Sequence, residues 1–145
     1  MTERRVAFVC VQNAGRSQMA AAFARMERDV RGFDWVGIVT GGTDPADAVH
    51  EVVVEAMAEV GIDLSDRTPR PVRPDELADC DIVITMGCSA DDVCPATWQG
   101  ESRDWALDDP HGRSLAEVRS IRDEIEKRVA ALFDELAADA TPADA

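Results

Sequence analysis

The sequence contains no tyrosine, a single lysine (Lys127) and no apolar run long enough to cross a membrane. The last of these absences excludes a membrane-spanning helix. The chain carries 29 acidic against 15 basic side chains, a net charge of −14, and such a surface repels nucleic acid and anionic membranes. No long apolar segment follows Met1, so we expect no signal peptide and a cytoplasmic location.

The remaining composition is that of a globular protein. The chain has 145 residues, of which 46% are apolar and 30% charged, which fits one domain with its own core. We expect this domain to span residues 1–137 and a disordered tail of small and polar residues to span 138–145. The acidic, lysine-poor surface fits two explanations, a salt-rich cytoplasm in which salt screens self-repulsion or a GC-rich genome, and composition leaves both open.

Short apolar runs alternate with helical patterns along the chain. We expect strands at 6–9, 33–40, 82–86 and 105–107, and helices at 18–27, 46–60, 75–78 and from Ser114 onward, where Glu117 completes a capping box. This alternation predicts an α/β fold: three layers, with a four-stranded parallel sheet flanked by helices. Ligands of such sheets bind beyond the carboxyl ends of the strands, where Cys10, Cys88 and Asp109 would meet.

The most informative segment joins the first strand to the first helix. A cysteine and an arginine stand at its two ends, spaced so that the loop can close around a tetrahedral oxyanion. We expect the backbone of this segment to bind the oxyanion, with these residues involved: Cys10, Val11, Gln12, Asn13, Ala14, Gly15, Arg16 and Ser17.

Each polar residue of this loop has an expected role. The helix dipole and nearby Arg16 favour the thiolate of Cys10, the nucleophile, and Ser17 can donate a hydrogen bond to the sulfur. Arg16 can grip two oxygens of the anion, and Asn13 can bond across the loop to hold its shape. The competing interpretation is a buried structural cysteine before an ordinary helix.

A nucleophilic cysteine also needs an acid to protonate the departing oxygen. Asp108-Asp109-Pro110 supplies candidates, and we favour Asp109 because the proline after it stiffens its presentation. Taken alone, the same three residues would be read as an exposed turn before a helix.

The loop resembles the active-site loop of the low-molecular-weight protein tyrosine phosphatase superfamily. Further similar segments occur in the expected order at 40–45, 56–65 and 109–110, so that the resemblance covers roughly residues 5 to 136. It implies that family's fold, a flavodoxin-like winding of the sheet. The tyrosine pair that follows Asp-Pro in many of the phosphatases is absent here, and His111-Gly112 stands in its place.

Residues 85–95 and 103–112 are similar to segments of one branch of that superfamily, the thiol-coupled arsenate reductases. The resemblance implies a relay in which Cys10 attacks arsenate, Cys88 forms a disulfide with Cys10 as arsenite leaves, and Cys94 then takes over the bond to Cys88. An external reductant, thioredoxin or a low-molecular-weight thiol, completes the cycle, with no bound cofactor or metal. Cys88 and Cys94 stand one residue closer than in the thioredoxin-coupled form, which leaves the reductant open.

Other functions remain in competition. The first alternative is a phosphatase, in which the same loop forms a phosphocysteine that water, activated by Asp109, hydrolyses. A zinc site could be drawn from Cys80, Cys88, Cys94 and His111, although no Cys-x-x-Cys pair supports it. An anion-binding protein without a nucleophile is a third alternative. His50 is expected to be a partly exposed polar residue, and His111 a turn residue without a required role.

Overall fold

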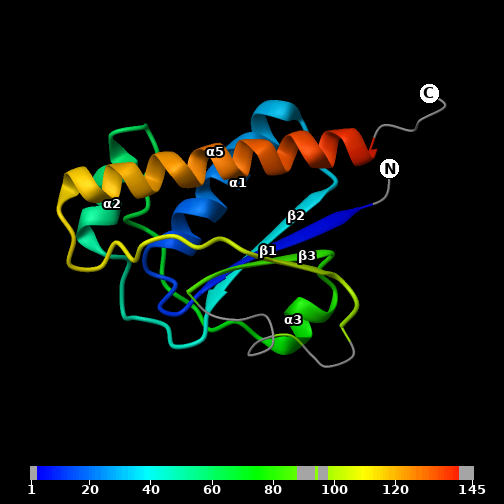
Figure 1. Ribbon diagram of the computed structural model, residues 1–145, viewed down its shortest axis with the longest axis horizontal. Coiled ribbons are helices and arrows are strands. Elements are labelled where there is room, and N and C mark those ends of the chain that lie inside the picture. The colour runs from blue at the N-terminus through cyan, green and yellow to red at the C-terminus, as the bar shows by residue number, and fades with distance from the viewer. Residues whose placement is uncertain (1–2, 88–93, 95–97, 141–145) are drawn as a thin grey trace.

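The fold is a parallel four-stranded sheet with helices on both faces. The computed structural model describes residues 3–87, 94 and 98–140. The strands are β1 (Arg4–Cys10), β2 (Val36–Gly42), β3 (Ile82–Met86) and β4 (Glu101–Asp104), in the order β2-β1-β3-β4 (Figure 1). All three strand pairings are parallel, which confirms the fold class and the winding expected from the sequence.

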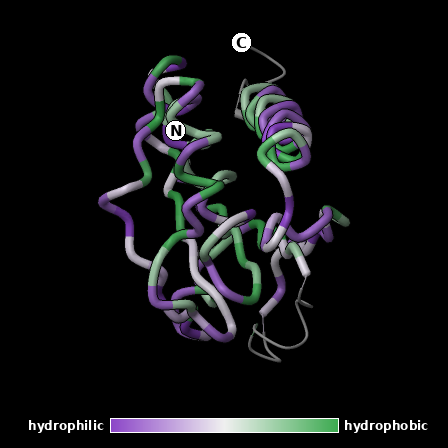
Figure 2. Tube along the Cα trace, turned by 90° about the vertical axis from the view of Figure 1, so that its left-hand side faces the viewer, coloured by the Kyte–Doolittle hydropathy of each residue, from purple (hydrophilic) through white to green (hydrophobic). Residues whose placement is uncertain are grey.

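The helices are distributed unequally over the two faces. Helices α1 (Arg16–Arg31), α2 (Glu51–Ala58) and α5 (Leu115–Ala140) cover one face, and the short α3 (Pro74–Ala78) lies on the other (Figure 1). Hydrophilic and hydrophobic positions are interspersed along α5 (Figure 2). Its buried positions recur at the helical spacing of three and four residues, and include Val118, Ile121, Ile125, Val129 and Leu132.

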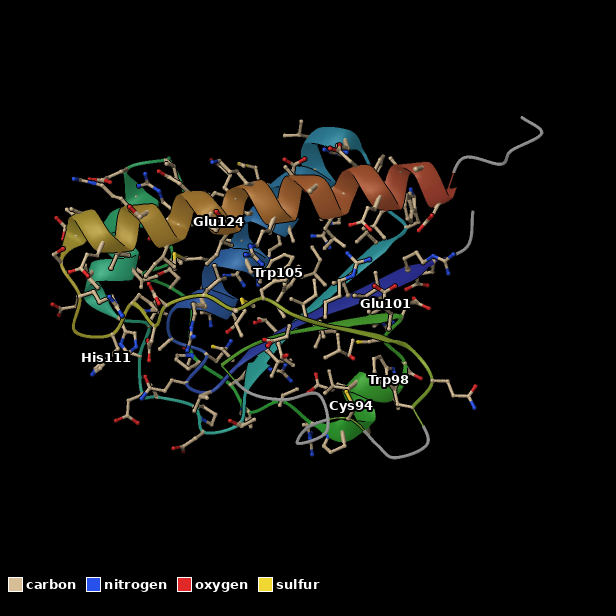
Figure 3. The ribbon with its side chains drawn as sticks, in the orientation of Figure 1. Cys94, Trp98, Glu101, Trp105, His111 and Glu124 are labelled. Carbon is tan, nitrogen blue, oxygen red and sulfur yellow. The ribbon has the colours of Figure 1, made fainter. Side chains whose placement is uncertain are left out.

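Two apolar clusters fill the space between these layers. The larger one lies under α1, α2 and α5 and contains Phe8, Phe23 and Phe133. The smaller one lies under α3, where Leu77 and Cys80 pack on β1 and β3; Cys94 and Trp98 join it from outside, as Figure 3 shows on the α3 side of the sheet. Cys94 therefore belongs to the opposite face of the sheet from α1.

The register of the sheet fixes where the site lies. Cys10, the last residue of β1, is paired with Gly42 of β2 on one side and Met86 of β3 on the other. Three strands therefore end together at one edge, and the loop after Cys10 starts from that edge. This is the position at which a doubly wound sheet binds its ligand.

The prediction of a fourth strand at residues 105–107 is wrong. The strand comprises Glu101–Asp104 and is polar, whereas Trp105–Leu107, chosen because they are apolar, lie outside it. An edge strand with an exposed face needs no apolar residues, so hydrophobicity is a poor guide to it. The side chain of Trp105 is buried, with its ring centroid 5.9 Å from that of Phe8, and its backbone N–H donates to Thr85 O just beyond the end of the strand.

Several helix boundaries differ from expectation, and α1, for example, ends four residues beyond the expected 18–27. The second helix is shorter than residues 46–60 and leaves Val60 39% exposed, although Gly61 has the left-handed φ of +81° expected where a helix ends. The final helix continues to Ala140, three residues into the expected tail, while residues 141–145 lie outside the described part of the chain. At its start, Ser114 and Glu117 form the expected capping box.

No helix within the described residues is both long and apolar enough to cross a membrane.

Ion pairs link the end of α2 to α5. Glu59 accepts hydrogen bonds from Arg119 at 2.6 Å and from Arg122 at 2.9 Å. These hydrogen bonds, with Arg119 contributing most, lower the pKa of the Glu59 carboxyl to about 2. Because the folded-state pKa lies below the ordinary value, the contribution to stability is present above the unfolded-state pKa and disappears as pH falls toward 2.

We therefore predict that Glu59→Gln lowers the urea midpoint of unfolding at pH 7 but much less at pH 2.5. The comparison variant is Glu126→Gln, which removes an exposed carboxylate from α5. It should leave the midpoint nearly unchanged at both pH values. Equal destabilisation by Glu59→Gln at pH 7 and pH 2.5 would contradict the ionic explanation.

Candidate active site

The loop after β1 is held open by its own carbonyl groups. Four of them accept hydrogen bonds at 2.8–3.2 Å from the backbone of residues 43–50: those of Cys10, Val11, Gln12 and Ala14. In a trans peptide the C=O and N–H point in opposite directions, so carbonyls turned outward turn the following amides inward. The result is a concave set of N–H groups around the Cys10 sulfur, the arrangement that binds anions.

The side chain of Asn13 organises the interior of this loop. It is fully buried, with φ at +51°, and its Oδ1 accepts hydrogen bonds from the backbone N–H of Arg70 and from Gln18 Nε2, both at 3.1 Å. A backbone N–H can only donate, so this atom must be the oxygen of the amide. The amide nitrogen therefore faces Ser17 Oγ at 2.7 Å and Thr40 Oγ1 at 3.0 Å.

This orientation determines where the Ser17 proton points. Ser17 Oγ accepts from Asn13, so its own O–H is available for Cys10 Sγ, 2.8 Å away. The backbone N–H of Asn13 donates to the same sulfur at 3.2 Å. Two donors thus converge on Sγ, and hydrogen bonds to a thiolate stabilise its charged form.

A cavity of about 260 Å³ opens above the sulfur. It is lined by Cys10, Val11, Gln12, Gly15, Arg16, His50, Gly87 and Asp109. Arg16 Nη1 donates to the carbonyl of Leu107 at 3.0 Å, and its Nη2 lies 3.9 Å from Asp109 Oδ2. The sheet therefore brings the predicted nucleophile, guanidinium and acid to one small cavity, which can hold a tetrahedral oxyanion.

Two glycines keep this cavity open. A Cβ on Gly87, where φ is +87°, would lie 2.8 Å from Arg16 Nη2. A Cβ on Gly15 would lie 2.6 Å from Pro110 Cγ, next to Asp109. Side chains at these positions would displace the guanidinium or the acid loop, so both glycines are required by close approach.

The other predicted residues occupy different positions. Asn13, Ala14 and Ser17 are buried beneath the cavity and shape it from below. Cys94 packs in the cluster under α3 and is not among the described residues that line the cavity. Cys88 lies outside the described residues.

Sequence reasoning missed several residues of the site. His50 is partly exposed, as expected, but it also lines the cavity, which was not foreseen. One feature of the sequence could have indicated His50. It occupies the N-cap position of α2, where Ser, Thr, Asp or Asn is favoured. Thr40 lies in the segment 40–45 that resembles the family, but its role and that of Arg70 could not be predicted from local sequence, because both reach the loop through tertiary contacts.

A larger cavity, of about 530 Å³, lies elsewhere and does not suit an oxyanion. Its lining includes four carboxylates, those of Asp79, Asp81, Glu101 and Asp139, against the single guanidinium of Arg4. An anion would be repelled there, whereas Arg16 and the inward amides favour one beside Cys10.

Cys80 has the properties of a structural thiol. It is 4% exposed, and burial raises the pKa of the Cys80 thiol to about 11, so it is protonated at neutral pH. The alternative zinc set is not assembled from its described members, because Cys94 lies beside α3 and His111 lies apart from it, near α2 (Figure 3). The part of the chain that the structure describes holds no group of three or more metal-ligating side chains.

Residues 5–141 match the family model described as low molecular weight phosphotyrosine protein phosphatase. The chain belongs to this family. A curated relative named putative arsenate reductase, from Halobacterium salinarum, is 62% identical over 129 residues, covering 88% of this chain and 89% of the relative. The superfamily resemblance carried by the loop is therefore confirmed.

Solved structures of arsenate reductases agree with the fold. The thioredoxin-dependent arsenate reductase of Corynebacterium glutamicum is 33% identical with a TM-score of 0.78, and the match covers 95% of this chain and 64% of that one. A structure titled an arsenate reductase in the phosphate binding state is 34% identical with a TM-score of 0.75, covering 91% of this chain and 98% of the other.

The hydrogen bond from Ser17 gives a direct prediction. Ser17→Ala removes one of the two donors to the sulfur, and alkylation of Cys10 by iodoacetamide at pH 7 should slow by about ten- to a hundred-fold, as expected for loss of a hydrogen bond to a charged group. Mass spectrometry of the alkylated peptide measures the rate.

The matched control is Ser120→Ala, which removes an exposed hydroxyl on α5 and should leave the rate unchanged. Unchanged alkylation in Ser17→Ala as well would mean that the Ser17 hydroxyl does not stabilise the thiolate.

Proposed function

We propose that this protein is an arsenate reductase that converts arsenate to arsenite through Cys10. The observation that carries the proposal is the sulfur of Cys10, which receives two hydrogen bonds at the floor of a cavity that also contains Arg16 and Asp109. The 62% identity to a putative arsenate reductase supports the same conclusion.

The first step is attack of the Cys10 thiolate on arsenic. Arsenate is held by the inward amides of residues 11–17 and by the planar fork of Arg16. Asp109 donates a proton to the departing hydroxyl, which leaves as water, and a sulfur–arsenic(V) bond replaces the broken oxygen–arsenic bond. The C=O of Leu107 holds Arg16 Nη1, which leaves the other side of the guanidinium for the anion.

The second step moves two electrons to arsenic. The thiol of Cys88, as thiolate, attacks Cys10 Sγ; the sulfur–arsenic bond breaks with its electron pair on arsenic, and arsenite departs. Cys94 then attacks Cys88, which releases Cys10 as a thiolate and leaves a Cys88–Cys94 disulfide. Two thiols are oxidised for each arsenate reduced. Cys94 exchanges with Cys88 and not with Cys10, which agrees with its place outside the cavity.

An external thiol must reduce the Cys88–Cys94 disulfide. We propose a thioredoxin-class dithiol, by analogy with the thioredoxin-dependent relative from Corynebacterium glutamicum. A low-molecular-weight thiol is the alternative. Competition between the two reductants in one assay distinguishes them.

A secondary phosphatase activity fits the same cavity. Phosphate and arsenate share charge and shape, and the Asp109 side chain is 58% exposed, so water can reach it to hydrolyse a phosphocysteine. The two activities differ in their need for Cys88 and Cys94, which only reduction uses.

The cysteines provide the test of this function. We predict that Cys10→Ser abolishes both arsenate reduction and aryl phosphate hydrolysis, because it removes the nucleophile. Cys88→Ser and Cys94→Ser should each lower arsenite release by at least about a hundred-fold and leave hydrolysis intact, since the disulfide relay is lost. The assay follows arsenite and free thiols with a dithiol present.

The matched control is Cys80→Ala, whose buried thiol takes no part in the relay and whose loss should leave both activities near the original values. Wild-type rates of arsenate reduction in both Cys88→Ser and Cys94→Ser would refute the relay. Hydrolysis far faster than reduction in the unaltered protein would identify it as a phosphatase instead.

A further inference from the structure

His50 is an unusual N-cap residue. Its backbone N–H donates to Ala14 O at 3.0 Å, but its side chain makes no capping hydrogen bond to the helix that it begins. The ring instead lies over the cavity, where its Nε2 is 3.1 Å from Gln12 Oε1. The N-cap position of α2 therefore lacks the side-chain hydrogen bond that would stabilise the helix, and its side chain contacts the site instead. A residue that is unfavourable for local structure in this way is typical of functional positions.

The partner of His50 is the other histidine of the chain. His111 follows Asp109 by two residues, and its ring centroid lies 4.8 Å from that of His50, with the rings tilted by 50°. The backbone N–H of His111 donates to Asp109 Oδ1 at 3.0 Å, so any shift of His111 also shifts the acid. The ring contact therefore joins the start of α2 to the segment that carries Asp109.

We propose that His50 and His111, which we call the histidine clamp, are positioning residues that hold Asp109 over the Cys10 cavity, and that the clamp opens when both rings are protonated. The proposal rests on the proposed function, since Asp109 is the acid of that reaction. Two uncharged rings in tilted contact attract each other, whereas two imidazolium rings at this distance repel.

The electrostatic surroundings agree with an uncharged ring at neutral pH. Burial lowers the pKa of His50, the neighbouring His111 lowers it further, and Asp109 opposes both with a smaller effect. Among the described residues, the other charged or titratable groups that line the same cavity are Arg16 and Cys10, and the exposed Glu51 follows His50 on its own helix. The clamp should therefore be closed at neutral pH and open under mildly acidic conditions.

The clamp can be tested without any enzymatic activity. The chain has only two histidines, so each single variant leaves one imidazole to follow by NMR. The ring of His50 should titrate below an ordinary histidine in the unaltered protein and at higher pH in His111→Phe, because the repelling charge is gone. Identical titration of His50 in both proteins would overturn the contact on which the proposal depends.

Activity supplies the second measurement. His50→Ala should lower kcat for arsenate reduction at pH 7 by about ten-fold, part of what a positioned acid contributes, and change KM less than about two-fold, because Arg16 and the amides still bind the anion. His50→Phe keeps a ring but not its charge, and should retain most of kcat at pH 7.

The pH profile separates a clamp from simple packing. Relative to the unaltered protein, His50→Phe should gain activity steadily from pH 7 to pH 5.5, because its ring cannot be protonated and repelled. A constant activity ratio over that range, or full activity in His50→Ala, would refute the proposal. An unaltered protein without arsenate reduction would instead refute the proposed function, and the NMR titration would still test the clamp.

Discussion

The site depends on one buried amide. Asn13 connects the loop to α1 through Ser17 and Gln18, to β2 through Thr40 and to the loop before α3 through Arg70. Its four contacts are mutually consistent only in one orientation of the amide, and that orientation sends the Ser17 proton to the Cys10 sulfur. The nucleophile is therefore prepared by a network whose other side chains lie outside the lining of the cavity, and a fault anywhere in it would leave buried polar groups unpaired.

The charge of the protein and the charge of its cavity have opposite signs. Most arginines are neutralised by carboxylates, often with two hydrogen bonds, as Arg70 is by Glu76 and Arg103 is by Glu135. Arg16 differs, because a carbonyl anchors it and the nearest Asp109 oxygen is 3.9 Å away. Its charge remains available for an anion in a chain of net charge −14, so a local field can overcome the global one.

The sequence predicted what is local and missed what is assembled from a distance. The first three strands, the loop from Cys10 to Ser17 and the capping box at Ser114 follow from short patterns, and all are present. The polar edge strand at 101–104 was not predicted because it forms by pairing with β3, and its own composition is not typical of a strand. The roles of His50 and Thr40 were not predicted for a related reason, because they depend on contacts with residues that lie tens of positions away in the chain and come close only in the folded state.

The segment 43–50 supports the loop mainly through main-chain atoms, to which the side chain of His50 adds one contact with Gln12. Its N–H groups hold four carbonyls of the loop, and a backbone N–H is the same whatever side chain accompanies it. Most side chains here can therefore be exchanged, provided that proline does not replace one of the four donors, Thr43, Asp44, Ala46 and His50, while adding or removing a single residue would move the donors out of line. What is preserved in such a stretch is its length and its path, a kind of constraint that comparison of residue identities would overlook.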